Sequence, residues 1–281
     1  YLLVGPWSHS QTFALHQAGE KQAGRTLPTN AALDLVAQRL AFFDRYLKEE
    51  PDILVQRSRV RVYITGADTS RANTWLDLPT FPAPNTFFKH FYLHSQGDAN
   101  NFPGDGVLSA DLPEDEPADH YRYDPALPTG FVTVSANDRR PIEIRADVLS
   151  YTSAPLKFPM TILGDIVLEL HAATDGPDTD WFAILTEVFP DGQSKSFHYA
   201  PAGLRARYRE GGGSESLLSA NQPTTYRIPM GPAGHQIAAG HRLRLSIFSA
   251  AFPEYEPNSN TGSPPATDCE LRVAQQTVFH D

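Results

Sequence analysis

From about residue 85 onward the sequence is a series of short alternating or apolar runs, each followed by turn-forming residues. Runs of this length and period are typical of β-strands, and no window here has the spacing of an amphipathic helix. The 24 prolines and 19 glycines among 281 residues agree with many turns and little helix. The pattern therefore predicts a mainly β protein with a jelly-roll β-sandwich. The expected strands cover residues 87–94, 162–171, 181–189, 225–229, 243–248 and 271–279.

The first 85 residues follow a different pattern. An apolar run at 1–4 and an alternating run at 59–65 predict two strands, the second ending at Gly66. Between them, residues 30–49 predict a helix that Thr29 or Asn30 could cap. Its apolar face consists of Leu33, Val36, Leu40, Phe43 and Leu47. Strand, loop, helix and strand form an α/β unit, so we expect an α/β segment over 1–85 and the jelly roll over 86–281.

Charge and composition exclude several classes of partner. The formal net charge is −10 and no strongly basic cluster occurs, which argues against binding to nucleic acid or to an anionic membrane. No apolar run approaches the length of a membrane span. Cys269 is the single cysteine, so an internal disulfide framework is excluded and the cellular compartment stays undecided.

His9 is the residue with the strongest chemical interest. It lies in the stretch GPWSHS at 5–10, directly after the apolar run, where an α/β enzyme can present a general base. The alternative is a structural histidine beside Trp7. A catalytic triad also needs a nucleophile on a strand-to-helix turn, usually G-x-S-x-G, and none is found. The closest sequence, GGSES at 212–216, lies in a polar loop and predicts a surface turn.

Metal and cofactor sites have little support in the sequence. The ten histidines are scattered and no Cys-x-x-Cys spacing occurs, so we expect no metal site and no cofactor. Asp175, Asp178 and Asp180 stand close enough to gather a calcium ion, but they lack the remaining ligands of an EF-hand loop. The interpretation favoured for these three carboxylates is a solvated turn before Trp181.

Taken together, a set of motifs resembles the cocaine esterase/NonD (CocE/NonD) family of acyl hydrolases over essentially the whole chain. These motifs are, in order, LVGPWSH at 3–9, FFDRYLK at 42–48, VRVYITG at 60–66, RADVLSYTSAPL at 145–156, DTDW at 178–181, FPDG at 189–192, LRARYR at 204–209, GHRLRLSI at 240–247 and NSNTG at 258–262.

The resemblance implies an α/β-hydrolase domain joined to a C-terminal jelly roll that also occurs in X-prolyl dipeptidyl peptidases. It implies that His9 is the base of a Ser-His-Asp triad whose serine and aspartate both precede residue 1. A short C-terminal tail after residue 281 is expected as well. On this interpretation the chain alone is inactive and needs the missing N-terminal hydrolase segment as its partner.

The resemblance also places the loop after Gly130 near the acyl pocket, so Phe131, Val132 and Val134 become candidates for binding substrate. This sequence departs there from the glycine pair common in the family, and the alternative is ordinary packing between domains. His241, Asp178 and Asp180 are interpreted as features of the fold.

Two functional hypotheses remain open from the sequence. The first is the C-terminal part of a serine acyl hydrolase acting on a small-molecule ester or amide. The second is a free-standing jelly-roll module that binds a carbohydrate or a protein partner. An α/β segment with exposed apolar faces favours the first. The sequence leaves open the choice among esters, β-lactam amides, amino acid esters and X-Pro peptides, and it also leaves open a homo-oligomer.

Overall fold

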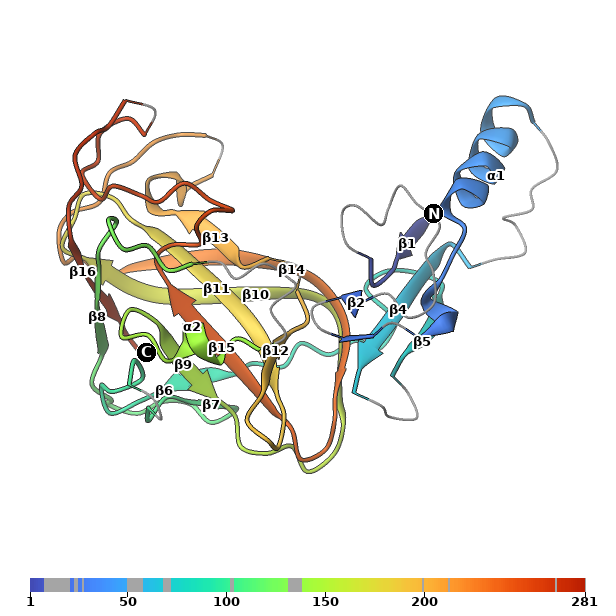
Figure 1. Ribbon diagram of the computed structural model, residues 1–281, viewed down its shortest axis with the longest axis horizontal. Helices are drawn as coiled ribbons and strands as arrows, with labels where there is room; N and C mark the ends of the chain where they lie inside the picture. Colours follow the sequence, from blue (N-terminus) through green and yellow to red (C-terminus); the bar gives the residue numbers. More distant parts are fainter. Residues whose placement is uncertain are drawn as a thin grey trace.

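The computed structural model describes residues 1–7, 21–22, 25–26, 28–49, 58–67, 72–101, 104–130, 138–198, 200–211, 213–265 and 267–280. Figure 1 shows a large β-sandwich beside a smaller α/β segment, from which helix α1 (Leu35–Leu47) projects away from the sandwich. A mainly β fold with a jelly-roll sandwich is thus confirmed.

The strands form two seven-stranded sheets. In the first sheet the order is β1 (Leu2–Val4), β4 (Val60–Gly66), β14 (Thr224–Ile237), β10 (Met160–Thr174), β16 (Ala274–Val278) and β8 (Asp119–Tyr123), with β5 (Thr74–Leu78) paired to β4. In the second sheet it is β12 (Ser194–Ser196), β11 (Asp180–Val188), β15 (Arg242–Phe248), β9 (Leu149–Thr152), β7 (Val107–Ser109) and β6 (Tyr92–His94), with β13 (Ala202–Arg205) paired to β11. A separate pair joins β2 (Lys21–Gln22) and β3 (Arg25–Thr26).

The main hydrophobic core lies between the two sheets. Side chains that alternate along the strands meet there, because successive residues of a strand point to opposite faces. The largest of them are Trp181, Tyr121, Tyr123, Tyr151 and Tyr226. All nine residues of β11 are buried, so its outer face must be covered too. A second cluster does this, formed by Phe182, Ile184 and Phe248 with Ile142 from the short helix α2 (Arg140–Glu143).

The α/β segment begins with two parallel strands. Leu2, Leu3 and Val4 of β1 face Val60, Arg61 and Val62 of β4, and α1 lies between the two strands in the chain. Helix α1 starts later than the sequence predicts, because Asp34 caps it by accepting a hydrogen bond from the Ala37 amide (2.9 Å). Thr29 and Asn30 instead belong to the short 3-10 helix η2 (Thr29–Ala31), so the capping prediction was wrong.

Strand β4 connects the α/β segment to the sandwich. Thr65 and Gly66 at its end pair in parallel with His235 and Gln236 of β14. A Cβ atom at Gly234 would lie 2.9 Å from the Tyr63 carbonyl oxygen, so only glycine allows the two strands to approach so closely. The first sheet therefore runs without interruption from β1 to β8.

Most strands predicted from the sequence exist, with shifted ends. The run at 87–94 forms a strand only at its end, in β6, and the side chains of Phe87 and Phe88 are exposed. The sequence did not predict β2, β3, β5, β7, β8, β9, β12 or β13. No helix in the described part of the chain has the length and apolar character needed to cross a membrane. The domain boundary near residue 85 stays a prediction.

Candidate active site

All four site residues predicted from the sequence lie outside the described residues: His9, Phe131, Val132 and Val134. The chain is described up to Trp7 before the first of them and up to Gly130 before the others. The candidate site is therefore built from the residues that lead into these two segments and from the side chains that hold them.

The segment that leads to His9 leaves β1 at its carboxyl end. In parallel sheets this edge carries the loops that bind ligands and perform chemistry. Pro6 is buried, and the ring of Trp7 folds back over Gly5. A Cβ atom at residue 5 would lie 2.5 Å from the Trp7 ring, so only glycine fits. The sequence GPW thus specifies one compact turn ahead of the histidine.

Trp7 anchors this turn in a cluster with two further aromatic rings. The centroid of the Trp7 ring lies 5.7 Å from that of Trp75 on β5, and the Trp75 centroid lies 5.1 Å from that of Tyr63 on β4. Aromatic pairs at these distances attract one another beyond the area that they bury. Tyr63 and Ala31 are buried against Trp75, and burial raises the pKa of the Tyr63 hydroxyl.

Polar contacts fix the same three rings, and Asn30 makes most of them. The Trp75 indole N–H donates to the Asn30 carbonyl (2.7 Å), and the Tyr63 hydroxyl donates to Asn30 Oδ1 (2.9 Å). The Asn30 side-chain amide donates to the carbonyl of Asn73 (2.8 Å). The Trp7 indole N–H donates to Ala31, the neighbouring carbonyl (3.1 Å). We call Trp7, Asn30, Ala31, Tyr63 and Trp75 the indole platform.

A second feature of the α/β segment is an apolar surface formed by helix α1 and β1. The sequence predicts that one face of α1 is apolar, and in the structure Leu40 (57%), Phe43 (51%) and Leu47 (75%) on that face are exposed. A groove of about 260 Å³ separates the helix from β1, with Tyr1, Leu3, Leu35 and Phe43 among the residues that line it. Contiguous exposed apolar surface of this kind is typical of an interaction site.

The segment with Phe131, Val132 and Val134 is held where it leaves the sandwich. Gly130 forms an isolated parallel bridge with Phe252, whose amide donates to the carbonyl of Thr129 (3.2 Å). The Thr129 hydroxyl donates to Asp147 (2.9 Å), which also accepts from Arg145 (2.7 Å).

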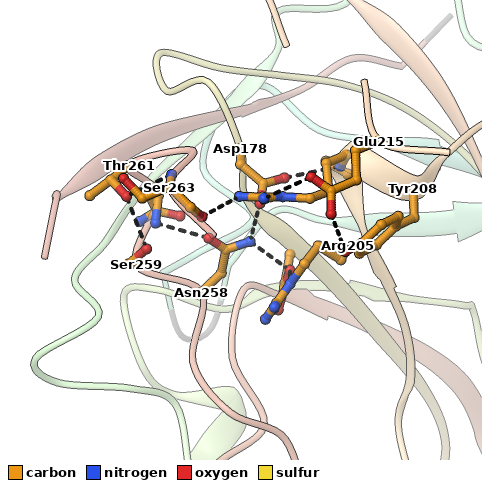
Figure 2. Close-up of polar contacts among 12 residues, drawn as sticks. Asp178, Arg205, Tyr208, Glu215, Asn258, Ser259, Thr261 and Ser263 are labelled. Atoms are coloured by element: carbon orange, nitrogen blue, oxygen red, sulfur yellow. Dashed lines mark hydrogen bonds and ion pairs between the residues drawn. The ribbon is translucent and has the colours of Figure 1, made fainter. Parts of the chain in front are cut away.

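The sequence interpretation of Asp175, Asp178 and Asp180 as a solvated turn was wrong for Asp178 and Asp180, which are buried. Asp178 is buried and bonded to Arg207 (2.8 Å), whereas Asp180 is buried and bonded to Arg205 (2.8 Å). The Asn258 amide donates to both carboxylates, as Figure 2 shows. Asp175 pairs with a different arginine, Arg272. The described residues include no group of three or more His, Cys, Asp or Glu side chains that could hold a metal ion.

This network closes the end of the sandwich around η3 (Ala206–Tyr208) and the loop at 258–263. Arg207 also donates to the Ser263 carbonyl (3.0 Å), and Glu215 accepts from the Tyr208 hydroxyl (2.9 Å). Buried charges are stable only when they are paired and hydrogen-bonded, so these motifs serve the fold. The GGSES stretch at 212–216, of which residue 212 lies outside the described residues, borders this network and has no strand leading into it.

Sequence reasoning missed a buried group at the junction of β4, β11 and β14. The carboxylate of Glu187 is fully buried and contacts His235 Nε2 (3.2 Å) and His241 Nδ1 (2.8 Å). His235 Nδ1 in turn lies 2.8 Å from the Thr65 hydroxyl on β4. The structural role expected of His241 fits this contact and its ring packing on Phe189. Nothing in the local sequence indicates that these residues meet.

The comparisons with known proteins agree on one family. Residues 54–281 match the sequence model of the X-Pro dipeptidyl-peptidase C-terminal non-catalytic domain. A cocaine esterase of Rhodococcus sp. (strain MB1 Bresler) is 35% identical to this chain over 270 residues. The chain belongs to the CocE/NonD hydrolase family. It corresponds to the C-terminal portion of a family member.

The match to the cocaine esterase covers 93% of this chain and 45% of the esterase. A putative serine esterase of Mycobacterium bovis is 24% identical, over 89% of this chain and 40% of its own length. The chain thus spans less than half the length of these curated relatives.

Solved structures give the same picture. An α-amino acid ester hydrolase superposes with a TM-score of 0.78 at 26% identity, over 99% of this chain and 48% of its own. An aminopeptidase from a marine sediment archaeon, a Thaumarchaeota archaeon, gives 0.75 at 25% identity, over 99% and 47%. The relatives are esterases or other hydrolases, as expected from the motifs.

Proposed function

We propose that this chain is the C-terminal part of a serine acyl hydrolase and supplies the general base, His9. The nucleophilic serine and the triad aspartate come from a polypeptide that precedes residue 1. The single observation that carries the proposal is the position of the GPW turn. It leaves the carboxyl end of a parallel strand, two residues before a histidine, in a chain whose relatives are esterases and other hydrolases.

The chemistry follows from what an imidazole can do beside a serine hydroxyl. His9 accepts the proton as the serine oxygen attacks the carbonyl of an ester or amide, and then gives it to the departing alcohol or amine. In the second half water attacks the acyl-enzyme, and the same histidine accepts the proton of water and returns it to serine. One group serves as base and acid when its pKa lies near the working pH.

The substrate is a small ester or amide. The relatives include an esterase, an α-amino acid ester hydrolase and an aminopeptidase, and enzymes of these three kinds all cleave an acyl bond. We place the acyl pocket beside Phe131, Val132 and Val134, because Gly130, which precedes them, is anchored to the sandwich through Phe252. Apolar side chains at this place would contact the acyl group.

His9→Ala tests the proposal in the enzyme that contains this chain together with the segment that supplies the nucleophile. We expect hydrolysis of an activated ester to fall by at least about 10³-fold, as in other triads that lose a member, while thermal unfolding is unchanged. The matched control is His90→Ala, another histidine, which lies in the segment between β5 and β6. Retained activity in His9→Ala would remove this histidine from the mechanism and leave a free-standing binding module as the alternative.

A further inference from the structure

The indole platform joins Trp7, in the segment that follows β1, to strands β4 and β5. Trp7 belongs to the segment after β1, whereas Tyr63 and Trp75 lie on β4 and β5, within the region that matches the domain described as non-catalytic. The two indole N–H groups, of Trp7 and Trp75, donate to consecutive carbonyls, those of Ala31 and Asn30. The two rings are thereby fixed relative to each other by one short piece of backbone.

Trp75 is itself held on several sides. Its centroid lies 5.1 Å from that of Tyr63, and the Arg61 guanidinium lies 5.3 Å above its ring. Asn73 accepts from the Asn30 side chain in a backbone conformation (φ 58°) that asparagine tolerates better than most residues. The four side-chain hydrogen bonds described for the platform thus converge on Asn30 or on its neighbour Ala31.

The distance along the chain makes this arrangement relevant to catalysis. Two residues span at most about 7 Å, so an error in the position of Trp7 is passed on to His9. A displacement of about 1 Å of a catalytic group can cost roughly 10²-fold in rate. Residues that hold such a group through packing and hydrogen bonds therefore affect turnover without contacting substrate.

We propose that Trp75 is a positioning residue for the general base, which it holds in place through Trp7 and with the help of Asn30. The proposal rests on the function proposed above for His9. It gives the domain described as non-catalytic a part in positioning the base, because β5 supplies the ring against which Trp7 packs.

The test compares two substitutions in the complete enzyme. Trp75→Leu removes the ring, and Trp75→Phe keeps an aromatic ring but removes the N–H donor to Asn30. Active sites are counted by labelling the serine to completion with a fluorophosphonate, so that turnover is expressed per labelled site. We expect kcat per site to fall at least tenfold in Trp75→Leu and about threefold in Trp75→Phe, with KM within threefold of the parent in both.

Trp181→Phe is the matched control, because Trp181 is buried in the sandwich core, where its ring packs on Tyr226. This variant should lose thermal stability but keep kcat per labelled site within twofold. It also leaves Trp7 and Trp75 as the only tryptophans that these 281 residues contribute, since the chain has three. Their exciton signal in circular dichroism should be present in Trp181→Phe and absent when Trp75→Phe is added.

The outcomes separate the two proposals. A merely structural role would lower the number of labelled sites and leave kcat per site unchanged, and this result overturns the positioning role. If Trp75→Leu does not fold, Trp75→Phe decides, and parental kcat per site in that variant overturns the proposal. Should His9→Ala retain activity, the proposed function itself fails. If His9→Ala is inactive but the Trp75 variants keep the parental kcat per labelled site, only the positioning role is refuted.

Discussion

At the residue scale, His198 illustrates what burial does to a titratable group near the junction of the two units. Burial is the main cause that lowers the pKa of His198 to about 4, and the neighbouring His235 adds to the effect. Its Nε2 atom is buried without a hydrogen-bond partner among the residues that the structure describes. The folded protein therefore keeps this imidazole neutral well below its ordinary pKa of about 6.5.

This lowered pKa makes the protein less stable in acid. Between pH 6.5 and 4 the unfolded chain binds a proton at His198 that the folded chain does not, so stability rises with pH and is lost as the pH falls through this window. The loss from pH 7 to pH 5 amounts to about 2 kcal/mol. His198→Gln, which cannot titrate, should reduce the difference between urea unfolding curves at the two pH values. An unchanged difference would show that other groups cause it.

At the element scale, the stability of helix α1 depends mainly on its N-terminal cap, because the described structure buries little of the helix. Asp34→Ala removes the acceptor for the Ala37 amide, which should cost about 1 kcal/mol. Because α1 is exposed, we expect the loss as roughly fivefold faster hydrogen exchange of its amides rather than as a lower global stability. The control is Asp44→Ala, which removes only the surface pair with Lys48 and should change exchange by less than twofold. Equal effects would mean that capping is unimportant here.

The same element shows how far sequence reasoning reaches. The period of residues 30–49 predicts a helix and its apolar face, but the cap is Asp34 because its side chain meets an amide three residues on. The alternation of 59–65 predicts β4 directly, because Val60, Val62 and Ile64, which alternate along the strand, are buried in one cluster. Phe87 and Phe88 look like strand residues, yet no described strand includes them. Periodicity thus predicts an element where it is sustained, as over 30–49 and 59–65, and fails for the short apolar run at 87–88.

The candidate site was predictable only in its local part. Gly5, Pro6 and Trp7 form a turn that the sequence specifies by itself, and His9 follows two residues later. The partners of Trp7 are 24 to 68 residues away in the chain, at Ala31 and Trp75, and no spacing links them to it. The contact between Glu187 on β11 and His235 on β14 likewise depends on how the two sheets pack together, which the sequence does not reveal.

At the scale of the whole molecule, the open side of the α/β segment predicts a companion polypeptide. The groove between β1 and α1 and the exposed face of the helix are expected to be covered by the segment that carries the nucleophile. Phe43→Glu should weaken this association at least tenfold, measured by co-purification and by recovery of esterase activity. Leu217→Glu is the control, because Leu217 is equally exposed (51%) but lies on the sandwich. A homogeneous, well-folded monomer of these 281 residues alone would contradict the prediction.

The uninterrupted sheet has a consequence for how such proteins can exchange parts by recombination. A chimaera joined at residue 54, where the domain match begins, separates Trp7 from Trp75 and β1 from β4. One joined at residue 85 keeps those contacts but separates β4 from β14, together with the contact between Thr65 and His235. Either junction therefore separates residues that contact each other in this chain. Exchange of this region between relatives should therefore succeed only when the contacting residues on both sides are inherited together.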